Sequence, residues 1–308
     1  MIKLVKMREF KEEELKRLFR PAANSSKEDN GKVTIIGGSS LFHGAPILAL
    51  KTASRVVDMV FFSSSEPSVG KVAEKIKSQL GSFIWVPFEE VGEYIQKSDA
   101  VLIGPGLRRY HREIQNSKCK SQNENAKFKM KLDETGLETK KITEKLLLQF
   151  PQKQWVIDAG SLQTMDKKFI PRNAILTPNK KEFQMLFNLK CQISNVKSKS
   201  KILNLVGKKA KEYHCIIVLK LAWTVVCSPE NCVVIEGGNA GLTKGGTGDV
   251  LAGLTVGLAA KNQPFLAAAA ASFIFKKAAD ELYKKVGFAY NADDLAQKIP
   301  EVLGKYWR

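Results

Sequence analysis

The sequence predicts an α/β fold, a three-layer αβα sandwich with a mostly parallel central sheet. Short, wholly apolar runs recur along the 308 residues, and segments with helical patterns separate most of them. Such runs are typical of strands that are buried on both faces, as the strands of a parallel sheet are. Apolar residues make up 44% of the chain, which is enough for a sizeable core. Alternating strands and helices therefore predict a sheet with helices on both sides.

The first expected strand covers residues 33–36 and ends at Gly37-Gly38. The spacing of this glycine pair leaves open whether it binds a ligand or only turns the chain. Pro46 is well placed for a first helical turn and predicts a helix that continues to about Val57. Further strands are expected at residues 59–62, 101–103, 155–157, 175–176, 216–219 and 233–235. Helices are expected at residues 248–260, 264–285 and 292–303.

The chain is expected to form one domain over residues 31–308, preceded by a charged lead-in at residues 1–30 that includes a short amphipathic helix. A polar insertion is predicted at about residues 108–139, which are rich in Lys, Asn and Glu. Between His111 and Lys131 there is almost no apolar periodicity, which favours a mobile segment. A helix is expected to follow at residues 142–150.

The net charge is +18, from 49 Lys and Arg against 31 Asp and Glu. An excess of this size either attracts anionic partners or reflects a lysine-rich, solvated surface. The lysines are scattered along the chain, which favours the second interpretation. We find neither an RNP-like aromatic motif nor a zinc-finger spacing, so the sequence does not predict a nucleic-acid partner.

Five cysteines without a C-x-x-C pair argue against a disulfide framework, because their number is odd. Cys215, Cys227 and Cys232 lie in apolar runs, where buried, reduced thiols are expected. The charged N-terminal segment lacks the core of a signal peptide. The longest apolar stretch, residues 265–275, is too short to span a bilayer, so we expect a cytoplasmic protein with no membrane partner.

The strongest local motif is a glycine-rich loop that leads directly into a helix. It consists of Gly245, Gly246, Thr247, Gly248 and Asp249. Glycines let backbone N–H groups converge, and the positive end of the helix adds to them, which makes an anion site. Asp249 could accept the proton of a hydroxyl group that attacks a bound γ-phosphoryl group. The alternative is a glycine-rich turn in which Asp249 is a simple helix cap. The loop is not a Walker A motif, because its lysine precedes the glycines.

Several motifs together resemble the ribokinase-like superfamily. They are Asp158-Ala159, the segment LTPNKKEF at residues 176–183, Val218-Leu219-Lys220, and the glycine loop at residues 245–249. Within that superfamily the chain is similar to the ADP/ATP-dependent NAD(P)H-hydrate dehydratases. This second resemblance depends on Gly44-Ala45-Pro46, on IGPGL at residues 103–107, and on Thr177-Pro178-Asn179. It covers roughly residues 31–305, except for the insertion.

The resemblance implies a metabolite-repair lyase that removes water from hydrated NADH or NADPH, with ATP or ADP as co-substrate and Mg²⁺ as cofactor. Asp249 would be the catalytic base that activates the ring hydroxyl. Gly246, Thr247 and Gly248 would stabilise charge on the phosphoryl group during transfer. Phosphorylation turns the hydroxyl into a good leaving group, and the lone pair of the ring nitrogen then expels phosphate.

Other site residues follow from the same resemblance. The implied nucleotide-binding residues are Lys220, Leu221, Ala222, Trp223, Thr224, Thr243, Gly245, Gly246, Thr247 and Gly248. The implied substrate-binding residues are Ala45, Gly104, Gly106, Asn179 and Asp249. Asn179 and Glu182 would hold Mg²⁺ through water, although the same spacing is also that of a helix N-cap and its partner. Leu221 stands where the family usually has glycine, so the nucleotide pocket is expected to differ there.

The resemblance also implies a homo-oligomer, a tetramer or larger. An epimerase domain would not fit into the first 30 residues, so any NAD(P)H-hydrate epimerase is expected to be a separate partner chain. Two alternatives stay open: a ribokinase-like kinase that acts on a vitamin precursor or sugar, and a nucleic-acid-binding module. The segments 44–46 and 104–106 favour the hydrated dinucleotide over the other kinase substrates.

Overall fold

The computed structural model describes residues 8–109, 134–189 and 198–307. Within these residues ten strands form one sheet, in the order β1-β10-β9-β8-β7-β6-β5-β2-β3-β4. The strands are β1 (Arg8–Glu9), β2 (Lys32–Ile36), β3 (Met59–Ser63), β4 (Ile84–Trp85), β5 (Ala100–Ile103), β6 (Gln154–Ile157), β7 (Ile175–Leu176), β8 (Ile216–Lys220), β9 (Thr224–Cys227) and β10 (Cys232–Ile235).

The sheet is parallel from β4 to β8, whereas β9 runs antiparallel to both of its neighbours, β8 and β10. The expected mostly parallel sheet is therefore confirmed, and each expected strand is present. The sequence did not predict β1, β4 or β9. Strands β1 and β4 have only two residues each, and β9 follows a tight turn after β8. None of the three therefore contains an apolar run long enough to predict a strand.

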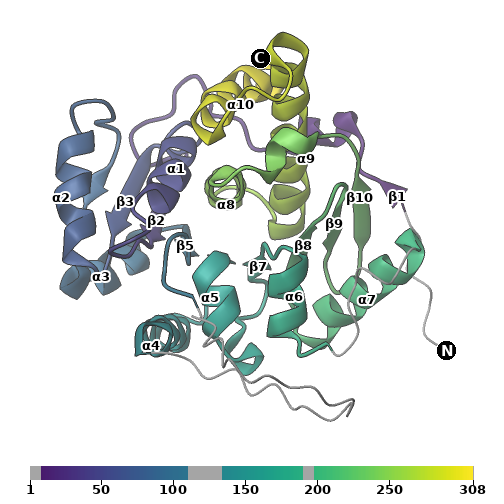
Figure 1. The fold of residues 1–308 in the computed structure, drawn as a ribbon. Coiled ribbons are helices and arrows are strands. Elements are labelled where there is room, and N and C mark those ends of the chain that lie inside the picture. Colours follow the sequence, from purple (N-terminus) through teal and green to yellow (C-terminus); the bar gives the residue numbers. More distant parts are fainter. Residues whose placement is uncertain (1–7, 110–133, 190–197, 308) are drawn as a thin grey trace.

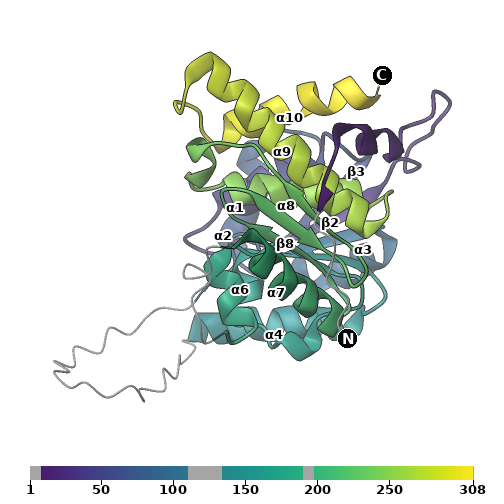
Figure 2. The same ribbon diagram turned by 90° about the vertical axis from the view of Figure 1, so that its right-hand side faces the viewer.

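Helices cover both faces of the sheet (Figures 1 and 2). One layer contains α1 (Gly44–Ala53), α2 (Pro67–Ile76), α8 (Thr247–Ala259), α9 (Pro264–Val286) and α10 (Ala292–Trp307). The other contains α3 (Val91–Lys97), α4 (Glu134–Gln149), α5 (Ala159–Thr164), α6 (Lys180–Leu186) and α7 (Lys199–Glu212). None of the helices in the described ranges is both long and apolar enough to cross a membrane.

Side chains alternate between the two layers along each strand, as the strand period requires. In β5, Ala100 and Leu102 belong to the core on the α8 side, whereas Val101 and Ile103 belong to the core on the α4 side. Both sets are fully buried, which explains why the strand reads as an unbroken apolar run in the sequence.

Several boundaries differ from expectation. Helix α1 begins at Gly44 and ends at Ala53, whereas a helix from Pro46 to about Val57 was expected. Helix α4 begins at Glu134, earlier than the expected residue 142, whereas the segment from His111 to Lys131 lies outside the described residues. In the expected lead-in, β1 pairs with β10, and a 3-10 helix, η1 (Glu12–Arg17), takes the place of the expected amphipathic helix. Leu15 and Leu18 are buried in the core on the α8 side, so this part of the lead-in packs with the sheet.

The expectation of reduced thiols is wrong for Cys227 and Cys232, which form a disulfide between β9 and β10. The two residues face each other in the antiparallel register, which a separation of five in sequence does not reveal. Cys215 is a buried free thiol as expected, and burial raises its pKa to about 12. Cys119 and Cys191 lie outside the described residues.

Helix α8 packs directly on the backbone of α1. A methyl group at Gly253 would lie 2.3 Å from the carbonyl oxygen of Ala49, and one at Gly257 would lie 2.9 Å from Cβ of Val56. Because these glycines have no side chain, α8 can lie close against α1 while its first turn reaches the carboxyl edge of the sheet. The position of Asp249 in that first turn depends on this contact.

We expect Gly253→Ala to lower the free energy of unfolding by about 1–3 kcal/mol, because the methyl group forces α1 and α8 apart. The opposite result is expected for Gly304→Ala in α10, where nothing lies within 4 Å of the added methyl group. There the higher helix propensity of alanine stabilises by at most about 1 kcal/mol. Urea denaturation of both variants measures the difference. Equal effects at the two positions would contradict the close α1–α8 contact.

Candidate active site

The residues named by the sequence gather at the carboxyl edge of the parallel strands, where ligands bind in open α/β sheets. Backbones approach closely there, and glycines make this possible. Gly104 has φ of 125°, and a methyl group on it would lie 1.8 Å from the carbonyl oxygen of Asp158. Gly106 has φ of 74°, and its methyl group would lie 2.5 Å from the carbonyl oxygen of Phe42. The chain's own packing therefore requires both glycines.

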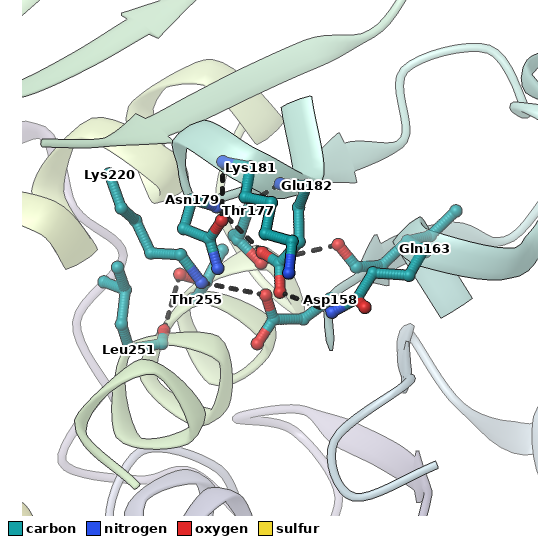
Figure 3. A network of polar contacts seen from close by, with 10 residues as sticks. Asp158, Gln163, Thr177, Asn179, Lys181, Glu182, Lys220, Leu251 and Thr255 are labelled. Atoms are coloured by element: carbon teal, nitrogen blue, oxygen red, sulfur yellow. Dashed lines mark hydrogen bonds and ion pairs between the residues drawn. The ribbon is translucent and has the colours of Figure 1, made fainter. Parts of the chain in front are cut away.

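Asp158 and Lys220 form an ion pair at this edge (Figure 3). Asp158 follows β6 directly, and Lys220 is the last residue of β8. Lys220 Nζ lies 3.0 Å from Asp158 Oδ1, and the aspartate side chain is 3% exposed. The next residue, Ala159, has φ of 48°, a left-handed conformation that is uncommon for alanine. The ion pair joins the ends of β6 and β8, between which β7 lies in the sheet.

Glu182 is a buried carboxylate in the first turn of α6. Its Oε2 accepts a hydrogen bond from the Asn179 backbone N–H at 2.8 Å, while Asn179 Oδ1 accepts from the Glu182 backbone N–H at 3.0 Å. This reciprocal pair is a capping box, so the N-cap interpretation of the spacing is confirmed. Gln163 donates to the other oxygen, Oε1, at 3.1 Å. Burial and the nearby Asp158 raise the pKa of Glu182, and Lys220 opposes them.

The glycine loop joins a short 3-10 helix (Ala240–Thr243) to the first turn of α8. Gly246 has φ of 89°, which glycine adopts without strain. Within the described part of the chain, the backbone N–H groups of Gly245, Gly246 and Gly248 donate no hydrogen bond, so they are available to an anion at the helix N-terminus. A methyl group on Gly248 would lie 3.4 Å from Lys220 Nζ. The loop and the ion pair are therefore neighbours.

Two polar side chains of this segment support the loop itself. The Thr247 hydroxyl donates to the carbonyl oxygens of Leu242 and Lys244, at 2.8 and 2.9 Å. Lys244 Nζ donates to the carbonyl oxygens of Phe288 and Tyr290, both at 2.5 Å, which ties the loop to the turn between α9 and α10. The Thr247 side chain is thus occupied in holding the loop.

Asp249 is half-buried in the first turn of α8. Burial is the main cause that raises its pKa to about 7, with the negative charge of Asp158 adding to it. Lys220 and Arg109 act in the opposite direction. Burial would lower the pKa of Lys220, but the charges of Asp158, Glu182 and Asp249 outweigh it and raise that pKa. The ammonium group of Lys220 thus interacts electrostatically with the carboxylates of Asp158, Glu182 and Asp249.

The other expected nucleotide-binding residues lie beside this cluster. Leu221, Ala222 and Trp223 form the tight turn from β8 to β9, closed by a hydrogen bond from Leu221 N–H to the Trp223 carbonyl at 3.0 Å. Thr224 is buried as the first residue of β9. The hydroxyl of the exposed Thr243 donates to the Ala240 carbonyl oxygen at 2.7 Å. The side chains of Leu221 and Trp223 pack against the core on the α4 side.

The expected substrate-binding residues adjoin the same edge. Asn179 and Lys220 form an isolated parallel bridge at the ends of β7 and β8. Ala45 lies in the first turn of α1, next to Pro46, whose Cδ would be 2.9 Å from a methyl group on Gly106. The loop after β5 thus lies against the start of α1, and the segment after β7 lies beside the end of β8.

Sequence reasoning gave no role to three polar residues of this region, Asp158, Gln163 and Arg109. Asp158 could have been recognised, because an acidic residue directly after a buried strand lies at the carboxyl edge. Gln163 is in α5 and Arg109 follows β5, and no local pattern marks either of them. Gln163 and Arg109 come near the site only through the packing of the helices against the sheet.

Comparisons with known proteins identify the family of the chain. Residues 33–301 match a family model described as NAD(P)H-hydrate dehydratase. The chain is 35% identical over 304 residues to the bifunctional NAD(P)H-hydrate repair enzyme of Methanocaldococcus jannaschii, an alignment that covers 94% of this chain and 51% of that enzyme. It is 30% identical over 226 residues to the ADP-dependent (S)-NAD(P)H-hydrate dehydratase of Nitrosopumilus maritimus, covering 70% and 67% of the two chains.

A solved structure has the same fold: the ADP/ATP-dependent NAD(P)H-hydrate dehydratase of Bacillus subtilis, co-crystallised with ATP and Mg²⁺. The TM-score is 0.74 at 22% identity, with 99% of this chain and 100% of that chain covered. This likeness shows a ribokinase-like architecture. The chain spans about half the length of the Methanocaldococcus jannaschii relative. Because the family model matches most of its length, the chain belongs to the NAD(P)H-hydrate dehydratase family.

Proposed function

We propose that this protein restores NADH and NADPH from their hydrated forms by a dehydration that consumes ATP or ADP. The observation that carries the proposal is Asp249, a half-buried carboxylate whose pKa is raised to about 7. It lies in the first turn of α8, where backbone N–H groups of the glycine loop are free to bind an anion. A base of this pKa is suited to general-base catalysis near neutral pH.

In the first step, Asp249 accepts the proton of the hydroxyl on the hydrated nicotinamide ring while the hydroxyl oxygen attacks the terminal phosphoryl group of the nucleotide. Gly246, Thr247 and Gly248 would stabilise the charge that develops on that group; the N–H groups of Gly246 and Gly248 have no partner among the described residues, whereas that of Thr247 donates to the Lys244 carbonyl oxygen at 3.4 Å. Oriented donors of this kind contribute on the order of 3–4 kcal/mol each. Lys220, next to Gly248, adds a positive charge beside the same loop.

In the second step, the bond between the ring carbon and the phosphate oxygen breaks. The lone pair of the ring nitrogen supplies the electrons, and loss of a proton from the neighbouring ring carbon restores the double bond. The products are NAD(P)H, inorganic phosphate and the shortened nucleotide. The phosphate ester exists only transiently, which separates this chemistry from that of a kinase.

The residues present fit a Mg²⁺ ion that binds together with the nucleotide. Asp158, Glu182 and Asp249, when ionised, exceed the single charge of Lys220 by two, which a divalent cation would balance. In the described residues, no group of three His, Cys, Asp or Glu side chains could hold a metal by itself. Mg²⁺ usually keeps several waters and binds one or two carboxylates plus phosphates. We propose that Asn179 and Glu182 hold its water shell; when bound, it would neutralise charge on the phosphates.

The relatives suggest finer details of this function. The name of the Nitrosopumilus maritimus enzyme specifies ADP and the S form of the hydrate, and we propose the S form as the substrate here. An epimerase would then have to convert the R form, and the bifunctional relative is consistent with a pairing of two repair activities. Assembly into a homo-oligomer and a cytoplasmic location stay predictions.

The test is to incubate the protein with hydrated NADH or NADPH and either nucleotide, and to follow the return of dihydronicotinamide absorbance. Recovery that requires ATP or ADP supports the proposal. A stable phosphate ester on another small alcohol, without any recovery, would instead support the alternative of a ribokinase-like kinase.

We expect Asp249→Asn to lower kcat by roughly 10²–10⁴-fold, because the amide cannot accept the hydroxyl proton. The affinity for nucleotide should change little, since the glycine loop is retained. Steady-state kinetics and nucleotide titration separate the two effects. Asp293→Asn is the control, because Asp293 is a half-buried carboxylate whose partner is Lys51. Activity retained in Asp249→Asn would overturn the assignment of the base.

The pH profile should report the ionisation of Asp249. Because the base must be ionised, kcat/KM is expected to fall below a pH of about 7. Asp158 raises the pKa of Asp249, so Asp158→Asn should lower that pKa and move the acid limb to lower pH. Asp166→Asn, which alters only the cap of a short 3-10 helix (Lys167–Phe169), should leave the limb in place. An acid limb that moves upward in Asp158→Asn would contradict this electrostatic account.

A further inference from the structure

Lys276 is a buried lysine that no part of the proposed chemistry uses. It lies in α9 and is 3% exposed. Its Nζ donates hydrogen bonds to two backbone carbonyl oxygens from different loops, that of Ala222 at 2.8 Å and that of Gly237 at 2.7 Å. Ala222 is in the turn between β8 and β9, and Gly237 follows β10. One side chain therefore joins two loops that are separated in sequence.

Burying an ammonium group is unfavourable unless hydrogen bonds compensate the loss of water. The two carbonyl oxygens provide that compensation for Lys276. Burial lowers the pKa of Lys276 to about 8, while Asp280 and Glu236 act in the opposite direction. The group therefore remains mostly charged at neutral pH. Charged donors make hydrogen bonds that are roughly twice as strong as neutral ones.

One helical turn further along, Asp280 holds the next part of the same loop. Its Oδ2 accepts from the Gly238 backbone N–H at 3.0 Å, and its Oδ1 from Asn239 Nδ2 at 3.4 Å. Asn239 Oδ1 in turn accepts from the Gly241 backbone N–H and from the Tyr290 hydroxyl, at 3.0 and 2.7 Å. This chain of contacts ends at the short 3-10 helix that leads into the glycine loop.

We propose that Lys276 is a positioning residue for the nucleotide, holding the β8–β9 turn and the loop after β10 at the separation that the nucleoside needs. The proposal rests on the proposed function, in which the turn from Lys220 to Thr224 and the loop before Asp249 bind ATP or ADP. Both loops are anchored to α9, where the Nζ atom of Lys276 donates to a backbone carbonyl oxygen of each. Lys276 itself would not touch the reacting atoms.

The experiment is a calorimetric titration of the full chain with ATP and with ADP, in wild type and in Lys276→Met. Methionine keeps the apolar length of the side chain but donates to neither carbonyl. We expect nucleotide affinity to fall roughly tenfold, because the two loops must then be ordered when the nucleotide binds. In turnover assays KM for the nucleotide should rise, while KM for the hydrated dinucleotide and kcat should change little.

Lys153→Met is the matched control. Lys153 Nζ also donates to two backbone carbonyl oxygens, those of Gln96 at 2.6 Å and Ser98 at 2.9 Å, and burial also lowers its pKa. It precedes β6, so it lies at the edge of the sheet opposite to the site. A purely structural role for Lys276 predicts that both variants lose thermal stability and that neither changes nucleotide affinity by more than about twofold.

That outcome would overturn the inference, as would an equal loss of affinity in the two variants. If Lys276→Met does not fold, Lys276→Gln, which retains a shorter donor, is judged by the same criterion. A wild-type protein that binds neither nucleotide would refute the proposed function itself. Wild-type binding that Lys276→Met and Lys276→Gln leave unchanged would refute the inference alone.

Discussion

The active site depends on one ammonium group, that of Lys220, placed among three carboxylates. Asp158, Glu182 and Asp249 would repel one another if they were ionised at one edge of the sheet without a positive charge between them. Lys220 pairs directly with Asp158 and acts on the other two through its field. The compensation is incomplete, because one charge faces three. Burial is the main cause that raises the pKa of Asp249 to about 7, and the uncompensated charge of Asp158 adds to it.

The second constraint is the contact between α1 and α8, which aims the first turn of α8 at the carboxyl edge. Gly253 and Gly257 allow the two helices to approach closely, and nearly every residue of α8 is buried. A helix that is fixed along its whole length presents its N-terminal N–H groups in a defined position without further ordering when an anion binds. The glycine loop is thus ordered when the protein folds, so that anion binding would require little further loss of conformational entropy.

The loops around the glycine segment are held by side chains that the proposed chemistry does not use. Thr247 and Lys244 close the glycine loop and attach it to the turn after α9. Lys276 and Asp280 attach the neighbouring loops to α9 itself. In the proposed function, the glycine loop would bind phosphate through backbone N–H groups, with these side chains behind it as supports. This arrangement suits phosphoryl transfer, in which the protein contributes mainly positioning and electrostatic stabilisation.

The sequence by itself determined the α/β class, the buried strands and the glycine loop with Asp249, because each depends on local pattern: apolar runs, glycine spacing and a helix start. It also marked Asn179 and Glu182, but the capping contact between them was decided by geometry. Only the tertiary structure decided that Cys227 faces Cys232, that Lys220 meets Asp158, and that Lys276 joins two loops. These pairs depend on strand register and on the packing of layers, which bring together residues that no spacing in the sequence relates.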